Sequence, residues 1–238
     1  MPSIFDNLNC VLENIAASAA RAGRDPSEIR LVAVTKNVDV ASVCSIVSAG
    51  VGHLGENRVQ EAAQKVPQVP SSPMWHLVGH LQRNKARHAV ELFSVIQSLD
   101  SLERAEELDR RCAARGVSLD TLLQVNVSGE STKYGVAPDA VAGVLREMPR
   151  FEHLRLRGLM TMAPYSDNPE DARVWFRALR CLARELSALR LSNVVMDELS
   201  MGMSGDYQVA VEEGSTIVRV GTAIFGPRSI KVEASYGP

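Results

Sequence analysis

The chain has 238 residues, of which 45 % are hydrophobic and 23 % are charged, which suits one large α/β domain or two small ones. Its formal net charge of −2 argues against a general nucleic-acid-binding protein, since that role needs a basic face that displaces counterions from phosphates. No stretch approaches the roughly 20 apolar residues that cross a bilayer, and the first 22 residues lack the continuous apolar core of a signal peptide.

The cysteines and histidines do not indicate disulfides or a metal site. The four cysteines lie far apart and form no CxxC pair, which is typical of reduced thiols in a cytoplasmic protein. The five histidines lack the spacing of zinc ligands on a helix. We therefore expect a cytoplasmic protein without a metal.

Strands and helices alternate along the whole chain. A helix over residues 3–22 opens it and ends at Gly23. Predicted strands cover residues 30–36, 51–55, 74–78, 94–98, 121–127, 156–160, 194–199 and 216–220. Predicted helices follow over residues 40–49, 58–66, 84–92, 102–115, 138–148, 169–189 and 206–213.

Eight strand–helix alternations predict a parallel sheet that closes into a single (β/α)₈ TIM barrel. An open, doubly wound sheet is the alternative, but it would usually show fewer strands and a GxGxxG motif after the first one, which is absent. We expect one domain over residues 1–238 with an extra N-terminal helix. Because only 18 residues follow Val220, we expect no C-terminal β-domain.

Lys36 ends the apolar run of the first predicted strand. Desolvation and nearby positive charge lower the pKa of a lysine, and the neutral amine forms a Schiff base with an aldehyde. A lysine in this place can equally extend its ammonium group into solvent at the strand end. The local pattern alone leaves both interpretations open.

Polar residues gather at the carboxyl ends of the predicted strands, where barrel enzymes place their active sites. Segments rich in glycine and hydroxyl groups follow the last two strands, at residues 200–206 and 221–226. Barrels often bind phosphate in these two loops, because glycines let backbone N–H groups approach an anion. Ser204 lies in the first segment and can alternatively be an ordinary helix N-cap.

The first and last strands adjoin in a closed barrel, so a ligand with an aldehyde and a phosphate would reach from Lys36 to the phosphate loops. Pyridoxal 5′-phosphate (PLP) is such a ligand. Arg219 would then lie between the two contacts, near the pyridine nitrogen. Since arginine does not readily give up its proton, it would leave that nitrogen unprotonated and weaken the ring as an electron sink.

Six segments carry a resemblance to the pyridoxal phosphate homeostasis protein family, whose members are single-domain relatives of the alanine racemase barrel. They are LVAVTK (31–36), GENRVQE (55–61), WHLVGHLQRNK (75–85), VNVSGESTKYG (125–135), RGLMTM (157–162) and LSMGMSGDYQVAVEEGSTIVRVGTAIFG (199–226). Thr35 and Leu54 stand where the family pattern has Ser and Phe.

The resemblance implies that the chain binds PLP and that Lys36 holds it as an aldimine. It also implies that Asn57 lies on the cofactor side of the site and that Arg219 contacts the ring nitrogen. Phosphate contacts are implied for four residues, which are Ser200, Ser204, Gly221 and Thr222.

The resemblance further implies that the chain buffers PLP or delivers it to apo-enzymes, without catalytic turnover. The alternative is an amino-acid racemase with weak or specialised activity. Racemisation by two bases needs a second base opposite Lys36, which the resembling racemases take from a C-terminal β-domain. Three tyrosines near the strand ends could substitute for it, namely Tyr134, Tyr165 and Tyr207. We expect a monomer that binds neither nucleic acid nor membrane. The basic segment 82–88 is a candidate surface for a partner, and the alternative is an ordinary helix face in contact with solvent.

Overall fold

The structure, a computed structural model, describes residues 3–130 and 132–227. In this part of the chain, eight parallel strands close into a barrel in sequence order. The strands are β1 (Arg30–Val34), β2 (His53–Glu56), β3 (Met74–Leu77), β4 (Val95–Leu99), β5 (Leu119–Gln124), β6 (Leu154–Met160), β7 (Val194–Ser200) and β8 (Ile217–Val220). The predicted fold class is therefore confirmed.

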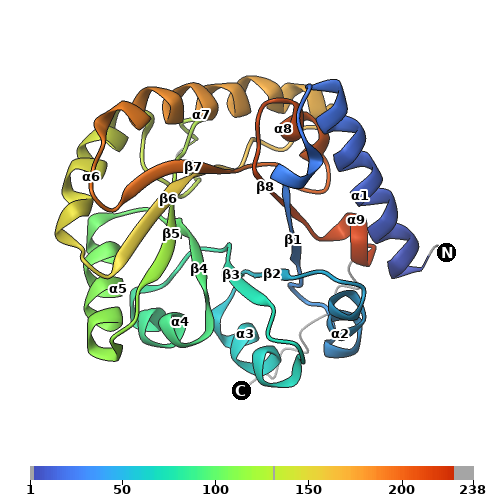
Figure 1. The fold of residues 1–238 in the computed structure, drawn as a ribbon, viewed down its shortest axis with the longest axis horizontal. Coiled ribbons are helices and arrows are strands. Elements are labelled where there is room, and N and C mark those ends of the chain that lie inside the picture. The colour runs from blue at the N-terminus through green and yellow to red at the C-terminus, as the bar shows by residue number, and fades with distance from the viewer. Residues whose placement is uncertain (1–2, 131, 228–238) are drawn as a thin grey trace, which may run out of the picture.

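Helices surround the strands, and Figure 1 shows α2 to α7 around the outside of the sheet. The helices are α1 (Ile4–Arg21), α2 (Val40–Ser48), α3 (Val59–Lys65), α4 (Ala86–Leu92), α5 (Leu102–Arg115), α6 (Val141–Glu147), α7 (Arg173–Leu186), α8 (Tyr207–Glu212) and α9 (Thr222–Phe225). Short 3₁₀ turns flank several of them, so the helix predicted over residues 169–189 is α7 with a 3₁₀ turn at each end. Within the described residues, none of these helices is long and apolar enough to cross a membrane.

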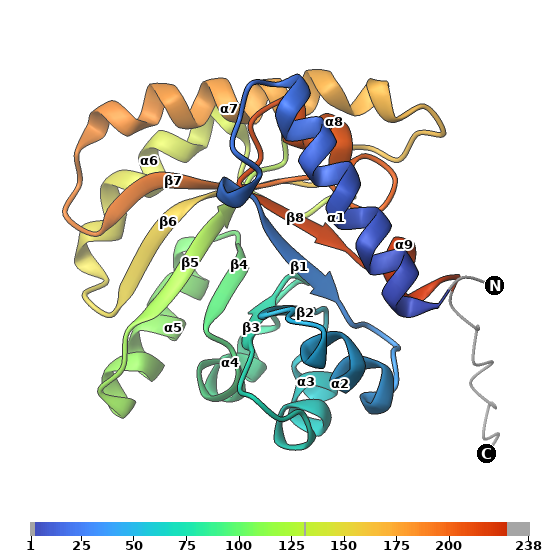
Figure 2. The ribbon, with the colours of Figure 1, turned by 45° about the vertical axis from the view of Figure 1, so that its right-hand side comes forward.

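Helix α1 covers the region where the barrel closes. Ser3 and Asp6 form a capping box that satisfies the first N–H groups of the helix. Leu8, Val11 and Ile15 recur at helical spacing and are buried. This apolar face packs against α8 and α9, as Figure 2 shows, so the helix braces the segments that follow β7 and β8.

The buried residues form two apolar clusters, a large one between strands and helices and a small one inside the barrel. The small cluster consists of Val32, Leu122, Met160 and Ile217. Polar side chains occupy another part of the interior: Ser200 on β7 donates a hydrogen bond to Gln97 on β4, two strands that are not neighbours in the barrel. A lumen that is partly polar departs from the branched aliphatic filling usual in such barrels.

All eight strands differ from their predicted ranges by one to three residues at one or both ends. Strand β1 ends at Val34 instead of residue 36, because the backbone of Asn37 adopts a left-handed conformation (φ 60°) and turns the chain. Strand β5 ends at Gln124 instead of residue 127, because Val125 and Asn126 pair with Val136 in their own loop. Strand β2 covers residues 53–56 instead of 51–55.

Candidate cofactor site

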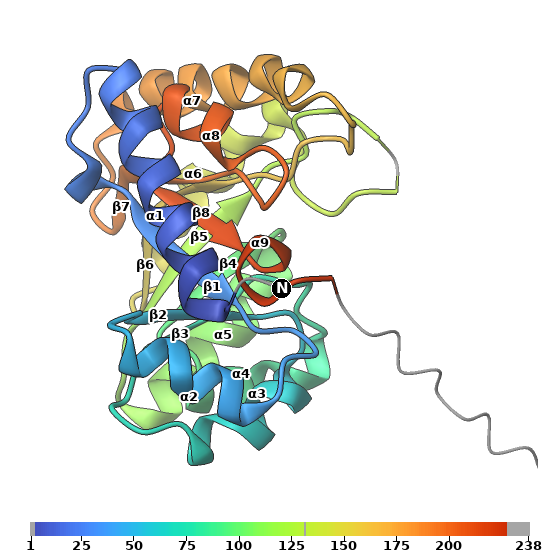
Figure 3. The ribbon, with the colours of Figure 1, turned by 90° about the vertical axis from the view of Figure 1, so that its right-hand side faces the viewer.

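Strands β1 and β8 lie side by side, as the closed barrel requires. Val32 pairs with Arg219 in the parallel register, and Ala33 pairs with Val220. The segment that carries Lys36 therefore emerges next to the turn at Gly221. In Figure 3, α9, which follows that turn, lies on the side of the barrel from which the loop after β5 projects.

Lys36 lies in the turn after β1 and is half-buried. Val32 belongs to the interior cluster, whereas Ala33 belongs to the outer core, so even-numbered residues of this strand face the lumen. Continuing this alternation past the strand assigns Lys36 to the interior side of the barrel mouth. The next residue is fixed from outside, since the Asn37 N–H donates to Glu61 Oε1 at 2.6 Å.

A buried ionic network holds this turn from the helix side. Lys65 on α3 donates to Thr35 O (2.6 Å), to Glu56 Oε1 (2.8 Å) and to Glu61 Oε1 (2.7 Å). Thr35 Oγ1 also donates to Glu56 Oε1 at 2.6 Å. Burial raises the pKa of Glu56, and the hydrogen bonds from Lys65 and Thr35 oppose that shift. Glu56 therefore supports the Lys36 turn from behind and does not line the mouth.

The glycine-rich loops after β7 and β8 meet at Ser204. Its hydroxyl oxygen accepts hydrogen bonds from the N–H groups of Gly221 and Ala223, both at 3.2 Å. Asp206 Oδ1 accepts from the Met203 N–H at 2.6 Å, which closes the loop that presents Ser204. Two backbone donors thus converge on the Ser204 oxygen, and a hydroxyl that accepts both can give its own proton to an anion.

Two glycines permit close approaches that a side chain would prevent. A Cβ atom on Gly79 would lie 2.3 Å from the carbonyl oxygen of Asn57, so the ends of β2 and β3 can approach only with glycine there. Gly202 has φ +92°, and a Cβ atom on it would lie 2.5 Å from Ala210 Cβ. These contacts place Asn57 at the mouth, half-buried, and seat the Ser204 loop on α8.

Arg219 is a buried cation, with 5 % of its surface exposed. Its guanidinium donates to Ser200 Oγ at 2.5 Å and to Thr161 O at 2.8 Å. Among the described residues no salt bridge involves it, and burial lowers its pKa to about 10. A buried guanidinium held mainly by neutral oxygens carries a desolvation cost that usually marks a functional site.

The structure brings most of the predicted residues together but separates the two serines. Ser204, Gly221 and Arg219 are linked through the loops after β7 and β8, whereas Thr222 is exposed on α9. The Ser200 hydroxyl is fully buried between Gln97 and Arg219, and its role as a phosphate contact stays a prediction.

Sequence reasoning missed Gln97 and His76, which are both fully buried polar residues on the strands. Gln97 lies between Ser200 and His76, donating from Nε2 to His76 Nδ1 at 3.0 Å. A polar residue in the middle of an otherwise apolar strand is the signal that could have identified each of them.

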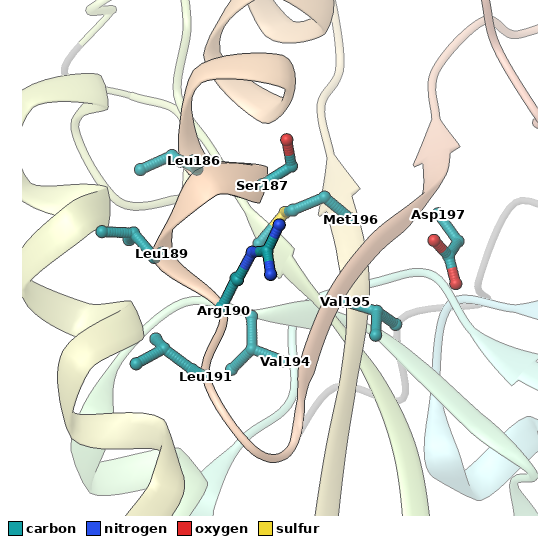
Figure 4. A pocket seen from close by; sticks show the side chains of 9 residues that line it. All are labelled: Leu186, Ser187, Leu189, Arg190, Leu191, Val194, Val195, Met196 and Asp197. Carbon is teal, nitrogen blue, oxygen red and sulfur yellow. The ribbon is translucent and has the colours of Figure 1, made fainter.

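Two cavities are lined by residues other than Lys36 and Arg219. One of about 400 Å³ borders the amino-terminal half of β7, and Figure 4 shows Arg190 extending across it among aliphatic side chains. It lies at the opposite end of β7 from Ser200 and holds none of the candidate site residues. The other, about 270 Å³, adjoins the loop of Ser204 and Asp206 from the side of Arg21.

Comparison with known proteins shows the family. The family model of the alanine racemase N-terminal domain matches residues 7–229. A pyridoxal phosphate homeostasis protein of Aquifex aeolicus is 40 % identical over 224 residues, which are 94 % of this chain and 97 % of that protein. Another, from Pseudomonas aeruginosa, is 38 % identical over 236 residues, covering 99 % of this chain and 100 % of that protein.

The chain belongs to the pyridoxal phosphate homeostasis protein family. PipY of Synechococcus elongatus, solved with PLP bound, superposes with a TM-score of 0.79 at 38 % identity, covering 89 % of this chain and 100 % of that one. An alanine racemase of Clostridium difficile superposes with a TM-score of 0.73 at 16 % identity, covering 95 % of this chain but only 58 % of the racemase. That second likeness supports the barrel fold alone.

Proposed function

We propose that this chain binds PLP and serves in its homeostasis by holding and releasing the cofactor. The observation that carries the proposal is the convergence of the Gly221 and Ala223 N–H groups on the oxygen of Ser204, next to the buried guanidinium of Arg219. Donors for a phosphate and a fixed donor for a ring nitrogen thus occur in adjoining segments. The names of the relatives and the PLP bound to PipY support the same ligand.

Lys36 is the residue proposed to bond covalently and reversibly to the aldehyde carbon of PLP. It lies past β1, the strand that pairs with β8, and alternation assigns it to the interior side of the mouth. When bound, PLP would contribute an aldehyde that condenses with an amine. Asn57 and Thr222 complete the proposed binding set from the β2 and β8 ends.

The positions of the three candidate tyrosines favour cofactor exchange over racemisation. Tyr207 is buried, with 5 % of its surface exposed, and Tyr134 stacks on His80 with ring centroids 3.8 Å apart. Tyr165 is 92 % exposed and donates to Asp167 Oδ1 at 2.9 Å, an interaction that raises its pKa. A raised pKa lowers the fraction of Tyr165 present as phenolate, the form that accepts a proton. Burial, stacking and this shift therefore do not favour any of the three tyrosines as a second base opposite Lys36.

The test is the absorbance of the purified protein with PLP, before and after reduction with borohydride, with mass mapping of the modified peptide. We expect a visible band that borohydride removes, and an adduct on Lys36. Lys36→Ala should lose both, whereas Lys85→Ala, a matched change in a 3₁₀ turn after β3, should keep both. A colourless wild-type protein, or an adduct on another lysine, contradicts the proposal.

A second measurement separates exchange from turnover. Wild-type protein loaded with PLP is incubated with alanine or serine in deuterium oxide, and deuterium at the α-carbon is measured by mass spectrometry. We expect no incorporation above a control with free PLP. Incorporation above that control would support the racemase. Transfer of PLP to an apo-enzyme faster than spontaneous release would support delivery as the role.

A further inference from the structure

A continuous chain of hydrogen-bonded side chains crosses the barrel from Arg219 to the amino-terminal end of β2. Arg219 Nη1 lies 2.5 Å from Ser200 Oγ, which lies 2.6 Å from Gln97 Oε1. Gln97 Nε2 lies 3.0 Å from His76 Nδ1. His76 Nε2 lies 3.0 Å from Nδ1 of His53, the first residue of β2. Five side chains on five strands are thus linked.

Arginine fixes the direction of every hydrogen bond in this chain. A guanidinium can only donate, so the Ser200 oxygen accepts from Arg219 and its own proton goes to Gln97 Oε1. The Gln97 amide nitrogen is then left to donate to His76 Nδ1. His76 must therefore carry its proton on Nε2 and donate it to His53. Reversing any one link leaves a buried donor or acceptor without a partner, which destabilises the reversed arrangement.

His76 keeps its Nδ1 unprotonated, so that this atom can accept the hydrogen bond from Gln97. Burial lowers the pKa of His76 to about 3, with smaller contributions from His53 and Arg30, so the ring is neutral at physiological pH. Burial and the charge of Arg30 also lower the pKa of His53. A proton on His76 Nδ1 would face the amide nitrogen of Gln97, and the chain would break between them.

We propose that Gln97 and His76 are positioning residues, which hold the guanidinium of Arg219 in one orientation through the hydroxyl of Ser200. The inference rests on the proposed function, because the orientation matters for the ring nitrogen of bound PLP. Ser200 provides one of two hydrogen bonds that hold the guanidinium, and the other goes to the fixed carbonyl of Thr161. Without Gln97, the hydroxyl of Ser200 is free to rotate, and the contact to Arg219 loses its fixed geometry.

Gln97→Met tests this inference, with Gln124→Met as its matched control. Methionine keeps the length of glutamine and removes the amide. Gln124 is also buried on a barrel strand, with 3 % exposed, but it donates to Tyr134 O and takes no part in the chain. Gln97→Glu retains an acceptor for Ser200 but loses the donor to His76 Nδ1, so it should restore the orientation only in part.

Two quantities are measured for each variant: the Kd for PLP by absorbance titration, and the ring-nitrogen pKa of the borohydride-reduced adduct by fluorescence against pH. For Gln97→Met we expect Kd to rise at least tenfold and the ring-nitrogen pKa to move up towards that of a free reduced adduct. Gln124→Met should stay within twofold of wild type, and Gln97→Glu should fall between Gln97→Met and wild type. Ser200→Ala combined with Gln97→Met should be no worse than Ser200→Ala alone, since both act on one contact.

Equal Kd and ring-nitrogen pKa in the Gln97→Met and Gln124→Met proteins would overturn the inference, as would additive losses in the double variant. If Gln97→Met does not fold, His76→Leu breaks the chain one link further away and should shift both quantities in the same direction by a smaller amount. An unchanged Kd and ring-nitrogen pKa in His76→Leu would also overturn the inference. A wild-type protein that takes up no PLP refutes the proposed function and this inference together, whereas the other failures leave PLP binding intact.

Discussion

Replacing Lys65 by methionine should destabilise the barrel and loosen the turn that carries Lys36. The ammonium group of Lys65 is 7 % exposed and makes three hydrogen bonds, two of them to carboxylates. Its loss leaves Glu56, which is fully buried, with the hydrogen bond from Thr35 to Oε1 but without its cationic donor. Glu56 Oε2 has no hydrogen-bond partner among the described residues even with Lys65 present.

The magnitude follows from these contacts. Hydrogen bonds to charged groups contribute about 1.5–3 kcal/mol each, and removing the lysine recovers several kcal/mol of its own desolvation cost. The balance agrees with the roughly 3–5 kcal/mol measured when one partner of a buried pair is removed. A typical domain is stable by about 5–15 kcal/mol, so the change in the free energy of unfolding is between about a fifth and the whole of the total.

The pH dependence provides a second, independent check. Without Lys65 the pKa of Glu56, already raised by burial, should rise further. A carboxyl group with a higher pKa in the folded state binds protons better when folded, so the deficit should shrink as the pH falls from 7 to 5, by up to about 1.4 kcal/mol per pH unit. Glu56→Gln in the Lys65→Met background should recover more than half of the loss, because the uncompensated charge is gone.

Urea unfolding at pH 7 and pH 5 measures these free energies, with Gln64→Met on the exposed face of α3 as control. Lys65→Met should also retain less PLP, since the network fixes Thr35 and Asn37 on both sides of Lys36. A loss below about 1 kcal/mol at pH 7 would refute the estimate for a broken buried pair. A loss of stability that is larger at pH 5 than at pH 7 would refute its assignment to the uncompensated charge of Glu56.

Further predictions concern three other buried contacts. Relative to His76→Gln, the wild type should lose stability by up to about 1.4 kcal/mol per pH unit below pH 6.5, because a histidine whose folded pKa is about 3 stays neutral while the unfolded chain takes up a proton. Urea unfolding from pH 7 to pH 4 measures the difference in the free energy of unfolding, and parallel curves for the two proteins would contradict the prediction. Gly79→Ala should lower the free energy of unfolding by about 2 kcal/mol or more and weaken PLP binding, since its Cβ would lie 2.3 Å from the Asn57 carbonyl oxygen. Thermal melts and PLP titration check this, and an unchanged melting midpoint would show that the ends of β2 and β3 can separate freely. Ser204→Ala should weaken PLP binding about tenfold with little loss of stability, because it removes a half-buried hydroxyl from the phosphate donors. Ser187→Ala, which changes an exposed serine, is the control, and equal Kd values for the two variants would exclude Ser204 from the site.

The sequence predicted the barrel well because strand–helix alternation is a local signal that repeats eight times. It predicted strand ends less well, because those depend on contacts made elsewhere. Strand β1 stops where Asn37 meets the carboxylate of Glu61, which is 24 residues away in the chain. Strand β5 stops where the chain begins to pair with its own loop near Val136.

The candidate site was predicted as a set of residues but without its internal partners. Ser200 and Ser204 lie in one glycine-rich motif, and only the fold separates a hydroxyl inside the lumen from one in a surface turn. The link between Gln97 and Ser200 spans 103 residues, so no spacing rule could indicate it. The buried pair of Glu56 and Lys65 was missed because a strand-end carboxylate and a helix lysine look like ordinary surface charges.

Burial differs across the proposed site in a way that suits exchange of a cofactor. Arg219 is buried and fixed by hydrogen bonds, whereas Lys36, Asn57 and Ser204 are half-buried and Thr222 is exposed. Hydrolysis of a bond between Lys36 and an aldehyde would need water at the imine carbon, and the half-burial of Lys36 leaves a path for it. Since Arg219 is buried whereas Lys36 and Ser204 are half-buried, we infer that Arg219 and the residues that orient it set which molecule is held, while the more open side at Lys36 and Ser204 sets how quickly it leaves. Variants at Gln97 should then mainly change how well the protein discriminates between ligands by their ring, and variants at Ser204 should mainly change the rate at which PLP is released.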